Sequence, residues 1–128
     1  MRAKHIPTVE EVDAASQVVG VPFSDDYREF LLRYGGAMVG PYPIYGLREV
    51  EVMEGGRWSV IEVTKEVRQL GVPEFADWFI FSEDHAGNPI GIDINGTVWI
   101  YDHDFGEIAE LVSDFEAYIR KQCFKIHL

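Results

Sequence analysis

Hydrophobic positions near the start of the chain recur at the spacing of two amphipathic helices. The first helix is predicted to begin after Thr8, which forms a capping-box pattern with Glu11, and to end at Gly20. The second is predicted to begin after Ser24 and to end at Gly35-Gly36. Its apolar residues stand at i, i+3, i+4 and i+7, and they predict one buried face: Tyr27, Phe30, Leu31 and Tyr34.

The pattern is weaker in the middle of the chain. Pro41 and Pro43 exclude a helix interior there, and residues 44–47 are predicted to form a short edge strand. Val50 and Val52 alternate with glutamates, which indicates a second weak strand. Residues 58–70 return to helical spacing, so a middle helix is predicted there.

From Trp78 onward the hydrophobic period changes to two. Strands are predicted at 78–81, 89–94 and 97–101, and Asn95-Gly96 predicts a hairpin turn between the last two. A short final helix is predicted to about residue 122, with Ser113 and Glu116 forming a second capping box. This order predicts an α+β fold: a single domain over residues 1–128, with an antiparallel twisted sheet (a meander in the second half) packed with two N-terminal helices, one middle helix and a short C-terminal helix.

Composition agrees with one globular domain. The chain has 128 residues, of which 47% are hydrophobic and 26% charged. Its single cysteine, Cys123, offers no internal disulfide and no paired zinc ligands. Neither a long apolar run nor a secretory signal pattern is present, so we expect a cytoplasmic protein with no cofactor and no membrane segment.

The distribution of charge along the chain says more about the kind of partner than the overall composition does. The formal net charge is −11, and residues 69–119 contain eleven Asp and Glu but no Lys or Arg. Such a field repels nucleic acid and attracts a basic protein partner. The alternative is that the acidic residues serve only solubility.

Residues able to carry chemistry cluster at two turns. Glu83, Asp84 and His85 follow one predicted strand, and Asp102, His103 and Asp104 follow another; in a meander both turns lie at the same end of the sheet. They could hold a divalent cation, act as an acid–base pair, or form ordinary solvated turns. The sequence lacks the motifs of serine hydrolases, P-loop proteins, zinc metalloproteases and dinucleotide-binding proteins. Cys123 and His127 share a helical spacing, but we expect Cys123 to be a small core residue.

Aromatic residues allow two interpretations. Trp99 and Tyr101 alternate with Val98 and Ile100, so they face the opposite side of their strand. Partly exposed, they would suit a protein-binding patch beside the acidic turns. Buried, they would simply be core residues, and the same two interpretations apply to Tyr42, Tyr45 and Trp58.

Taken in order, several of these motifs resemble the SUKH superfamily, in its Smi/Knr branch. The resemblance rests on Val21-Pro22 with the helix from Asp26 to Gly36, on the Ile80–Asp93 hairpin, on Gly96–Asp104, and on the closing Ser113–Ile119 segment. It covers roughly residues 8–122 and is weak between 37 and 76. Gly35 stands where many members have Asn, and both residue types accept a left-handed helix cap.

The resemblance implies an α+β domain without catalytic residues, similar to bacterial immunity proteins of polymorphic toxin systems, often against nucleases. We therefore expect a non-enzymatic protein that neutralises a basic toxin domain through an acidic surface. The expected partner-binding residues are Glu83, Asp84, His85, Trp99, Tyr101, Asp102 and Asp104. Two alternatives remain open: a small metal-binding or hydrolytic protein using Asp84/His85 and Asp102/His103/Asp104, and an adaptor, scaffold or small-ligand-binding domain.

Overall fold

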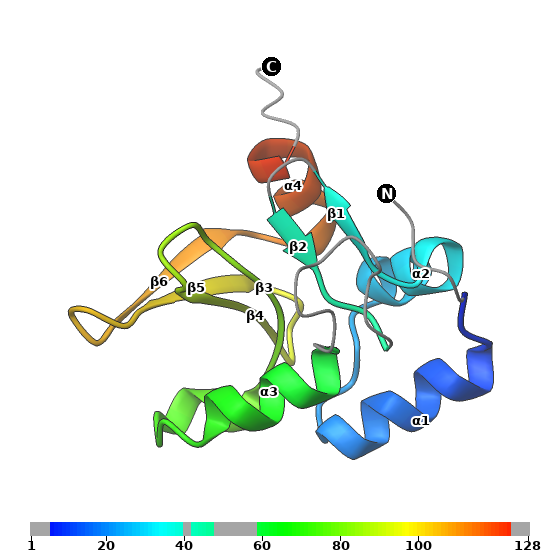
Figure 1. Ribbon diagram of the computed structural model, residues 1–128, viewed down its shortest axis with the longest axis horizontal. Coiled ribbons are helices and arrows are strands. Elements are labelled where there is room, and N and C mark those ends of the chain that lie inside the picture. Colours follow the sequence, from blue (N-terminus) through cyan, green and yellow to red (C-terminus); the bar gives the residue numbers. More distant parts are fainter. Residues whose placement is uncertain (1–5, 40–41, 48–58, 124–128) are drawn as a thin grey trace.

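The computed structural model describes residues 6–39, 42–47 and 59–123. Helices come first, a four-stranded sheet follows, and a short helix closes the chain, as Figure 1 shows. The elements in chain order are α1 (Val9–Val19), α2 (Asp25–Tyr34), β1 (Ala37–Val39), β2 (Tyr42–Ile44), α3 (Val60–Arg68), the 3-10 helix η1 (Pro73–Asp77), β3 (Trp78–Glu83), β4 (Pro89–Asp93), β5 (Val98–Asp102), β6 (Glu107–Val112), α4 (Phe115–Tyr118) and the π-helical turn η2 (Ile119–Cys123).

The main sheet is an antiparallel meander in the order β3-β4-β5-β6, and β1 and β2 form a separate two-stranded hairpin. Trp78 is paired with Asp93, and Trp99 is paired with both Gly91 on β4 and Glu110 on β6. This register puts the β3–β4 and β5–β6 turns at one end of the sheet and the β4–β5 turn at the other. The predicted α+β architecture with a meander is confirmed.

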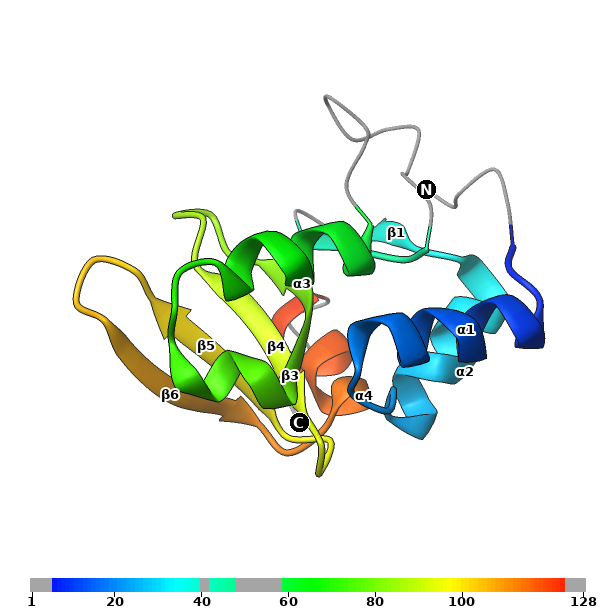
Figure 2. The same cartoon turned by 90° about the horizontal axis from the view of Figure 1, so that it is seen from below.

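Helices cover both faces of the sheet (Figure 2). On one face, α1, α2 and α4 enclose the larger core, in which aromatic rings from three elements meet. Tyr27 of α2 lies 5.0 Å from Phe79 and 5.3 Å from Phe115 between ring centroids. The side chains of Tyr27 and Phe79 are completely buried, so this contact holds α2 against β3.

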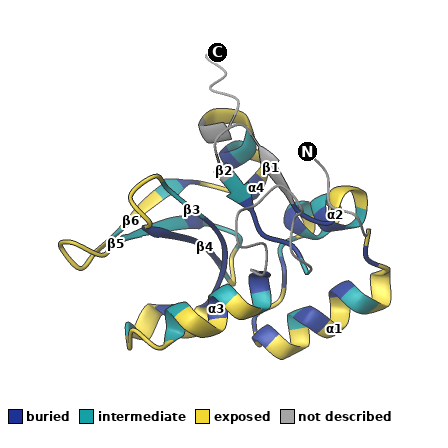
Figure 3. Ribbon diagram, in the orientation of Figure 1, coloured by how far each residue is buried: buried dark blue, intermediate teal, exposed yellow. Residues whose placement is uncertain are grey.

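On the opposite face, α3 and η1 cover a smaller core of Phe75, Trp78 and Ile80. Because helices lie on both sides, β3 is buried along nearly its whole length, as Figure 3 shows. Gly91 of β4 is required by this packing: a Cβ atom there would lie 2.9 Å from Trp78 Cε3 and 3.2 Å from the Phe79 carbonyl oxygen.

Arg68, at the end of α3, ties the layers together. Its Nε donates to the Phe75 carbonyl (3.0 Å), Nη1 to the Val19 carbonyl (2.7 Å) and Nη2 to the Trp78 carbonyl (3.0 Å). One guanidinium therefore joins α1, α3, η1 and β3. Burial lowers the pKa of Arg68, and the nearby Asp77 carboxylate acts in the opposite direction.

The capping interactions predicted at the starts of α1 and α2 are confirmed only for α1. The Thr8–Glu11 capping box is formed, with Glu11 N–H donating to Thr8 Oγ1 at 3.2 Å. Ser24 is the residue before α2 as predicted, but its side chain makes no capping bond. An unpredicted capping box, Ser59–Glu62, begins α3.

Other boundaries differ from the sequence-based expectations. The capping residue of α4 is Asp114, which accepts from Ala117 N–H at 2.8 Å, so the predicted box at Ser113 is wrong by one position. The strand predicted at residues 44–47 lies earlier, as β2 (Tyr42–Ile44). Pro43 is tolerated there because it lies in an edge hairpin, where its missing N–H leaves no hydrogen bond unmade. Strands β1 and β6 were not predicted.

Three expected burials also need correction. Tyr34 is 38% exposed and Phe30 only partly buried, because the end of α2 projects beyond the sheet. Ile94, expected to lie with Ile90 and Ile92, belongs to the β4–β5 turn and is 63% exposed.

The expected strand at Val50 and Val52, together with Trp58, lies outside the described residues. Among the described helices, none is long and apolar enough to cross a membrane.

Candidate functional site

Asp84 organises the β3–β4 turn. Its Oδ1 accepts hydrogen bonds from Ala86 N–H (2.9 Å) and Asn88 N–H (2.8 Å), and its Oδ2 accepts from Asn88 Nδ2 (3.0 Å). Burial raises the pKa of Asp84, but the hydrogen bonds from Asn88 and Ala86 outweigh it, so the pKa lies below its usual value. The Asp84 carboxylate therefore stabilises the β3–β4 turn, in which all three of these hydrogen bonds are made.

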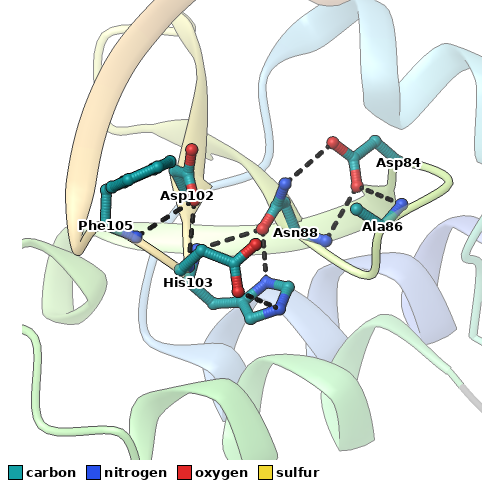
Figure 4. Close-up of polar contacts among 7 residues, drawn as sticks. Asp84, Ala86, Asn88, Asp102, His103 and Phe105 are labelled. Atoms are coloured by element: carbon teal, nitrogen blue, oxygen red, sulfur yellow. Dashed lines mark hydrogen bonds and ion pairs between the residues drawn. The ribbon is translucent and has the colours of Figure 1, made fainter.

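Asn88 joins this turn to the β5–β6 turn, as Figure 4 shows. Its Oδ1 accepts from His103 N–H at 3.0 Å and also contacts His103 Nδ1. The predicted juxtaposition of the two turns at one end of the sheet is confirmed, and the bridging residue is Asn88. We refer to Asp84, Asn88, Asp102 and His103 as the turn network.

Asp102 and Asp104 take part in local contacts as well. Asp102 Oδ1 accepts from Asp104 N–H at 2.9 Å and from Phe105 N–H at 3.2 Å. Asp104 Oδ1 lies 3.4 Å from His103 Nε2. In the described part of the chain, no group of three or more His, Cys, Asp or Glu side chains is arranged to hold a metal ion. The Asp and His side chains of these turns thus mainly brace the two loops.

Glu83 has a different environment from its neighbours. Tyr45 donates its hydroxyl hydrogen to Glu83 Oε1. Burial raises the pKa of Tyr45, and the hydrogen bond to Glu83 and the negative charge of that carboxylate raise it further. Both residues line a hollow of about 220 Å³ beside α3, so Glu83 faces this hollow and not the turn network.

A groove at the other end of the sheet collects carboxylates and an aromatic ring. Its volume is about 340 Å³. It is lined by Glu74, Asp77, Trp78, Asp93, Ile94, Asn95, Trp99 and Ile108, and we call it the Trp99 groove. Trp99 is only partly buried, and its ring is stacked on that of Trp78 with 6.2 Å between centroids and 15° between planes.

Asp93 fixes the wall of the Trp99 groove. Its Oδ1 accepts from Asn95 N–H (2.8 Å) and Thr97 N–H (3.0 Å), and its Oδ2 accepts from Trp99 Nε1 (2.9 Å). Gly96, with φ of +86°, supplies the left-handed residue that the turn needs. The sequence therefore closes this hairpin and locks the Trp99 indole through a single carboxylate.

The charges of this half of the chain are largely uncompensated. Among the described residues, Glu116, paired with Arg120 at 2.8 Å, is the single carboxylate of 69–119 in an ion pair with a lysine or arginine. In contrast, the hollow of about 570 Å³ between α2 and α4 has Arg33 on its rim, 3.7 Å from Glu29. Arg68 lies near Asp77, but within the described residues no lysine or arginine of residues 1–68 forms an ion pair with a carboxylate of 69–119.

The seven expected partner-binding residues do not form one patch. Asp84, His85, Asp102 and Asp104 lie at the turn-network end. Glu83 faces the hollow beside α3, and Trp99 lies toward the opposite end of the sheet. Tyr101 is partly buried with its ring edge-on to Phe75 at 5.2 Å, so it contributes to the smaller core.

Sequence reasoning did not single out the carboxylates of the Trp99 groove. Glu74 and Asp77 are exposed residues of η1, a helix that had not been predicted. Pro73 follows α3 in the chain and begins η1, where the missing N–H of a proline costs nothing. A search for acidic residues just after that proline, beside the first sheet strand, could have identified both.

Comparisons with known proteins agree with this fold. The model of the SMI1 / KNR4 family (SUKH-1) matches residues 6–121. The crystal structure of a protein from Pseudomonas syringae pv. tomato is similar, with a TM-score of 0.74 at 14% sequence identity, over 98% of this chain and 88% of the other. At this identity the likeness concerns the fold alone. No match was found among curated proteins.

Proposed function

We propose that this chain, which belongs to the SMI1 / KNR4 family (SUKH-1), is an immunity-type protein that binds and neutralises a basic toxin domain. The observation that carries the proposal is the uncompensated charge: within the described residues, the carboxylates from Glu74 to Asp114 form no ion pair with lysine or arginine. Resemblance to bacterial immunity proteins supports the same class of function.

In this proposal the chain acts by occlusion and performs no turnover. A nuclease toxin needs a basic surface to hold phosphates, and a rigid acidic surface can occupy it. Unpaired carboxylates favour rapid encounter with such a partner, while buried aromatic contacts prolong the complex once formed. The proposed partner is therefore a basic protein, with a nuclease as the favoured kind of toxin.

The test is protection by co-expression. Where the gene beside this one encodes a secreted protein with a C-terminal toxin domain, that domain is expressed in cells with and without this chain. Restored growth and a purified complex would support the proposal. Growth arrest that persists despite soluble expression of this chain would contradict it.

The charge mechanism has its own measurement. The association rate constant of the purified pair is expected to fall about tenfold or more as ionic strength rises from about 0.05 M to about 0.5 M, because screening removes the steering field. An association rate that does not change with salt would show that the acidic surface does not steer binding.

A further inference from the structure

We propose that the Trp99 groove is the part of the surface that receives the partner, and that its occupant is an arginine side chain. This inference rests on the proposed function and assigns a place to it. Carboxylates at the rim and the orientation of the indole distinguish this groove from other hollows of the described residues.

Three exposed carboxylates lie at or beside the groove, and none of them forms an ion pair within the described residues. Glu74 and Asp77 line the groove from η1 and form no ion pair within the described residues. Glu110 is paired with Trp99 in the sheet register, so its side chain emerges on the same face of the sheet. The charge of Arg68 interacts with that of Asp77, but the side chain donates its hydrogen bonds to the carbonyl groups of Val19, Phe75 and Trp78. Arg68 therefore offsets only part of the charge of Glu74, Asp77 and Asp93, and the groove keeps a net negative charge that favours a cation.

The indole limits what can be recognised. The Nε1–H of Trp99 already donates to Asp93, so the ring has no free donor to offer a ligand. What remains is the aromatic surface of a partly buried ring, held in place by the stack on Trp78. An aromatic surface bordered by carboxylates favours a cation.

Arginine fits this combination better than lysine. Its planar guanidinium can stack on an indole while its N–H groups reach carboxylates at the edge, whereas an ammonium group is more strongly hydrated and cannot stack. The side chain of Ile94, 63% exposed at the mouth of the groove, offers an apolar contact to the aliphatic stem of the same arginine.

The other hollows are less suited to a cation from outside. The α2–α4 hollow also has carboxylates, including Asp25 and Asp26, but Arg33 already lies on its rim beside Glu29, Glu116 is paired with Arg120, and no indole lines it. In the hollow beside α3, Glu83 accepts the hydroxyl hydrogen of Tyr45. Among these hollows, the Trp99 groove alone combines exposed carboxylates that form no ion pair within the described residues with a partly exposed indole.

The test uses an acetylated penta-arginine peptide as the probe and records the indole N–H signal of Trp99 by two-dimensional ¹H–¹⁵N NMR. The matched peptide contains citrulline, which keeps the shape of arginine without its charge, and a third contains lysine. We expect the Trp99 signal to shift with penta-arginine, to shift less with penta-lysine and to stay unchanged with penta-citrulline. Equal shifts with arginine and citrulline would overturn the proposal.

Two variants separate a specific groove from a diffuse negative field. In Glu74→Gln/Asp77→Asn, affinity for penta-arginine is expected to fall roughly tenfold. The control, Glu10→Gln/Glu107→Gln, removes the same charge from exposed positions on α1 and at the start of β6. Its affinity is expected to change less than about twofold. Equal losses in both variants would overturn the proposal, and the same NMR spectra verify that each variant is folded.

The toxin domain distinguishes failure of this inference from failure of the proposed function. If Glu74→Gln/Asp77→Asn binds the toxin domain as tightly as the unmodified chain does, the groove assignment is wrong while the immunity function stands. If the unmodified chain does not bind or protect at all, the proposed function itself is wrong. A selective loss of toxin binding in the groove variant supports both.

Discussion

The two ends of the sheet carry similar numbers of acidic side chains and use them in opposite ways. At the turn-network end, Asp84 and Asp102 accept hydrogen bonds from backbone N–H groups of their own turns, and Asn88 links one turn to the other. At the Trp99 groove, Asp93 alone has this bracing role, while the side chains of Glu74 and Asp77 make no hydrogen bond or ion pair within the described residues.

This difference shows why the count of acidic residues is a poor guide to a binding surface. A carboxylate that accepts two or three backbone hydrogen bonds has little left to offer a partner, and removing it damages the fold. A carboxylate on an exposed helical turn adds little to stability and remains available. The expected partner-binding set included more of the first kind than of the second.

The largest expected effect concerns the support beneath the Trp99 groove. In Arg68→Lys, one ammonium group replaces a guanidinium that donates to carbonyls on three elements, and at least one buried carbonyl loses its donor. We expect the free energy of unfolding to fall by about 3 kcal/mol, measured by urea denaturation. Lys65→Arg, an exposed change on the same helix, is the control and is expected to leave stability unchanged. Equal stability of Arg68→Lys and the unmodified chain would show that the guanidinium does not anchor η1.

The next effect separates bracing carboxylates from available ones. Asp84→Ala removes the acceptor of three hydrogen bonds and leaves the backbone N–H and Nδ2 of Asn88 without their acceptor, so we expect a loss of about 2 kcal/mol in the free energy of unfolding. Glu74→Ala, an exposed carboxylate of the groove, is expected to change it by less than about 0.5 kcal/mol. The distinction between the two ends would be contradicted if both substitutions cost the same.

A pH series sharpens the same distinction. Because the pKa of Asp84 is lower in the folded chain than its reference value of 3.8, the unfolded chain binds the proton more readily. The stabilisation from Asp84 is complete well above pH 3.8 and is lost as the pH falls through the lower folded value. The difference in unfolding free energy between the unmodified chain and Asp84→Asn should therefore shrink from pH 7 toward pH 3. A difference for Asp84→Asn that stays constant over this pH range would refute the account.

Sequence patterns predicted the parts of this fold that depend on local chemistry. The Thr8–Glu11 box, the helix around Tyr27 and Leu31, and the hairpin at Asn95-Gly96 each follow from contacts within a few residues, and all three were confirmed. The same local signal at Ser59–Glu62 was present and was overlooked.

Features that depend on distant contacts could not be predicted in the same way. Strand β6 was not predicted, for two reasons. A register shift opposite Val98 and Trp99 interrupts the alternation of apolar and polar residues in β6, and Glu107, Ala109 and Glu110 are exposed because β6 is an edge strand. The Trp99 groove needs η1 beside the β4–β5 turn, a juxtaposition made by tertiary packing. At the turn-network end, the predicted meander correctly placed the β3–β4 and β5–β6 turns together. No sequence pattern indicated that Asn88 would connect them.

The smallest expected effect on stability concerns Ser24, the N-cap residue of α2. Its side chain makes no capping bond, its Oγ is buried without a hydrogen-bond partner, and its Cβ lies near the Gly96 backbone of the β4–β5 turn. Ser24→Ala removes an unsatisfied buried hydroxyl, so we expect unchanged or slightly higher stability, within about 0.5 kcal/mol. Thr8→Ala, where the hydroxyl does cap α1, is the matched comparison and is expected to cost about 1 kcal/mol. Thermal unfolding of both variants measures the difference, and a larger loss for Ser24→Ala than for Thr8→Ala would mean that the Ser24 hydroxyl has a partner holding α2 against the β4–β5 turn.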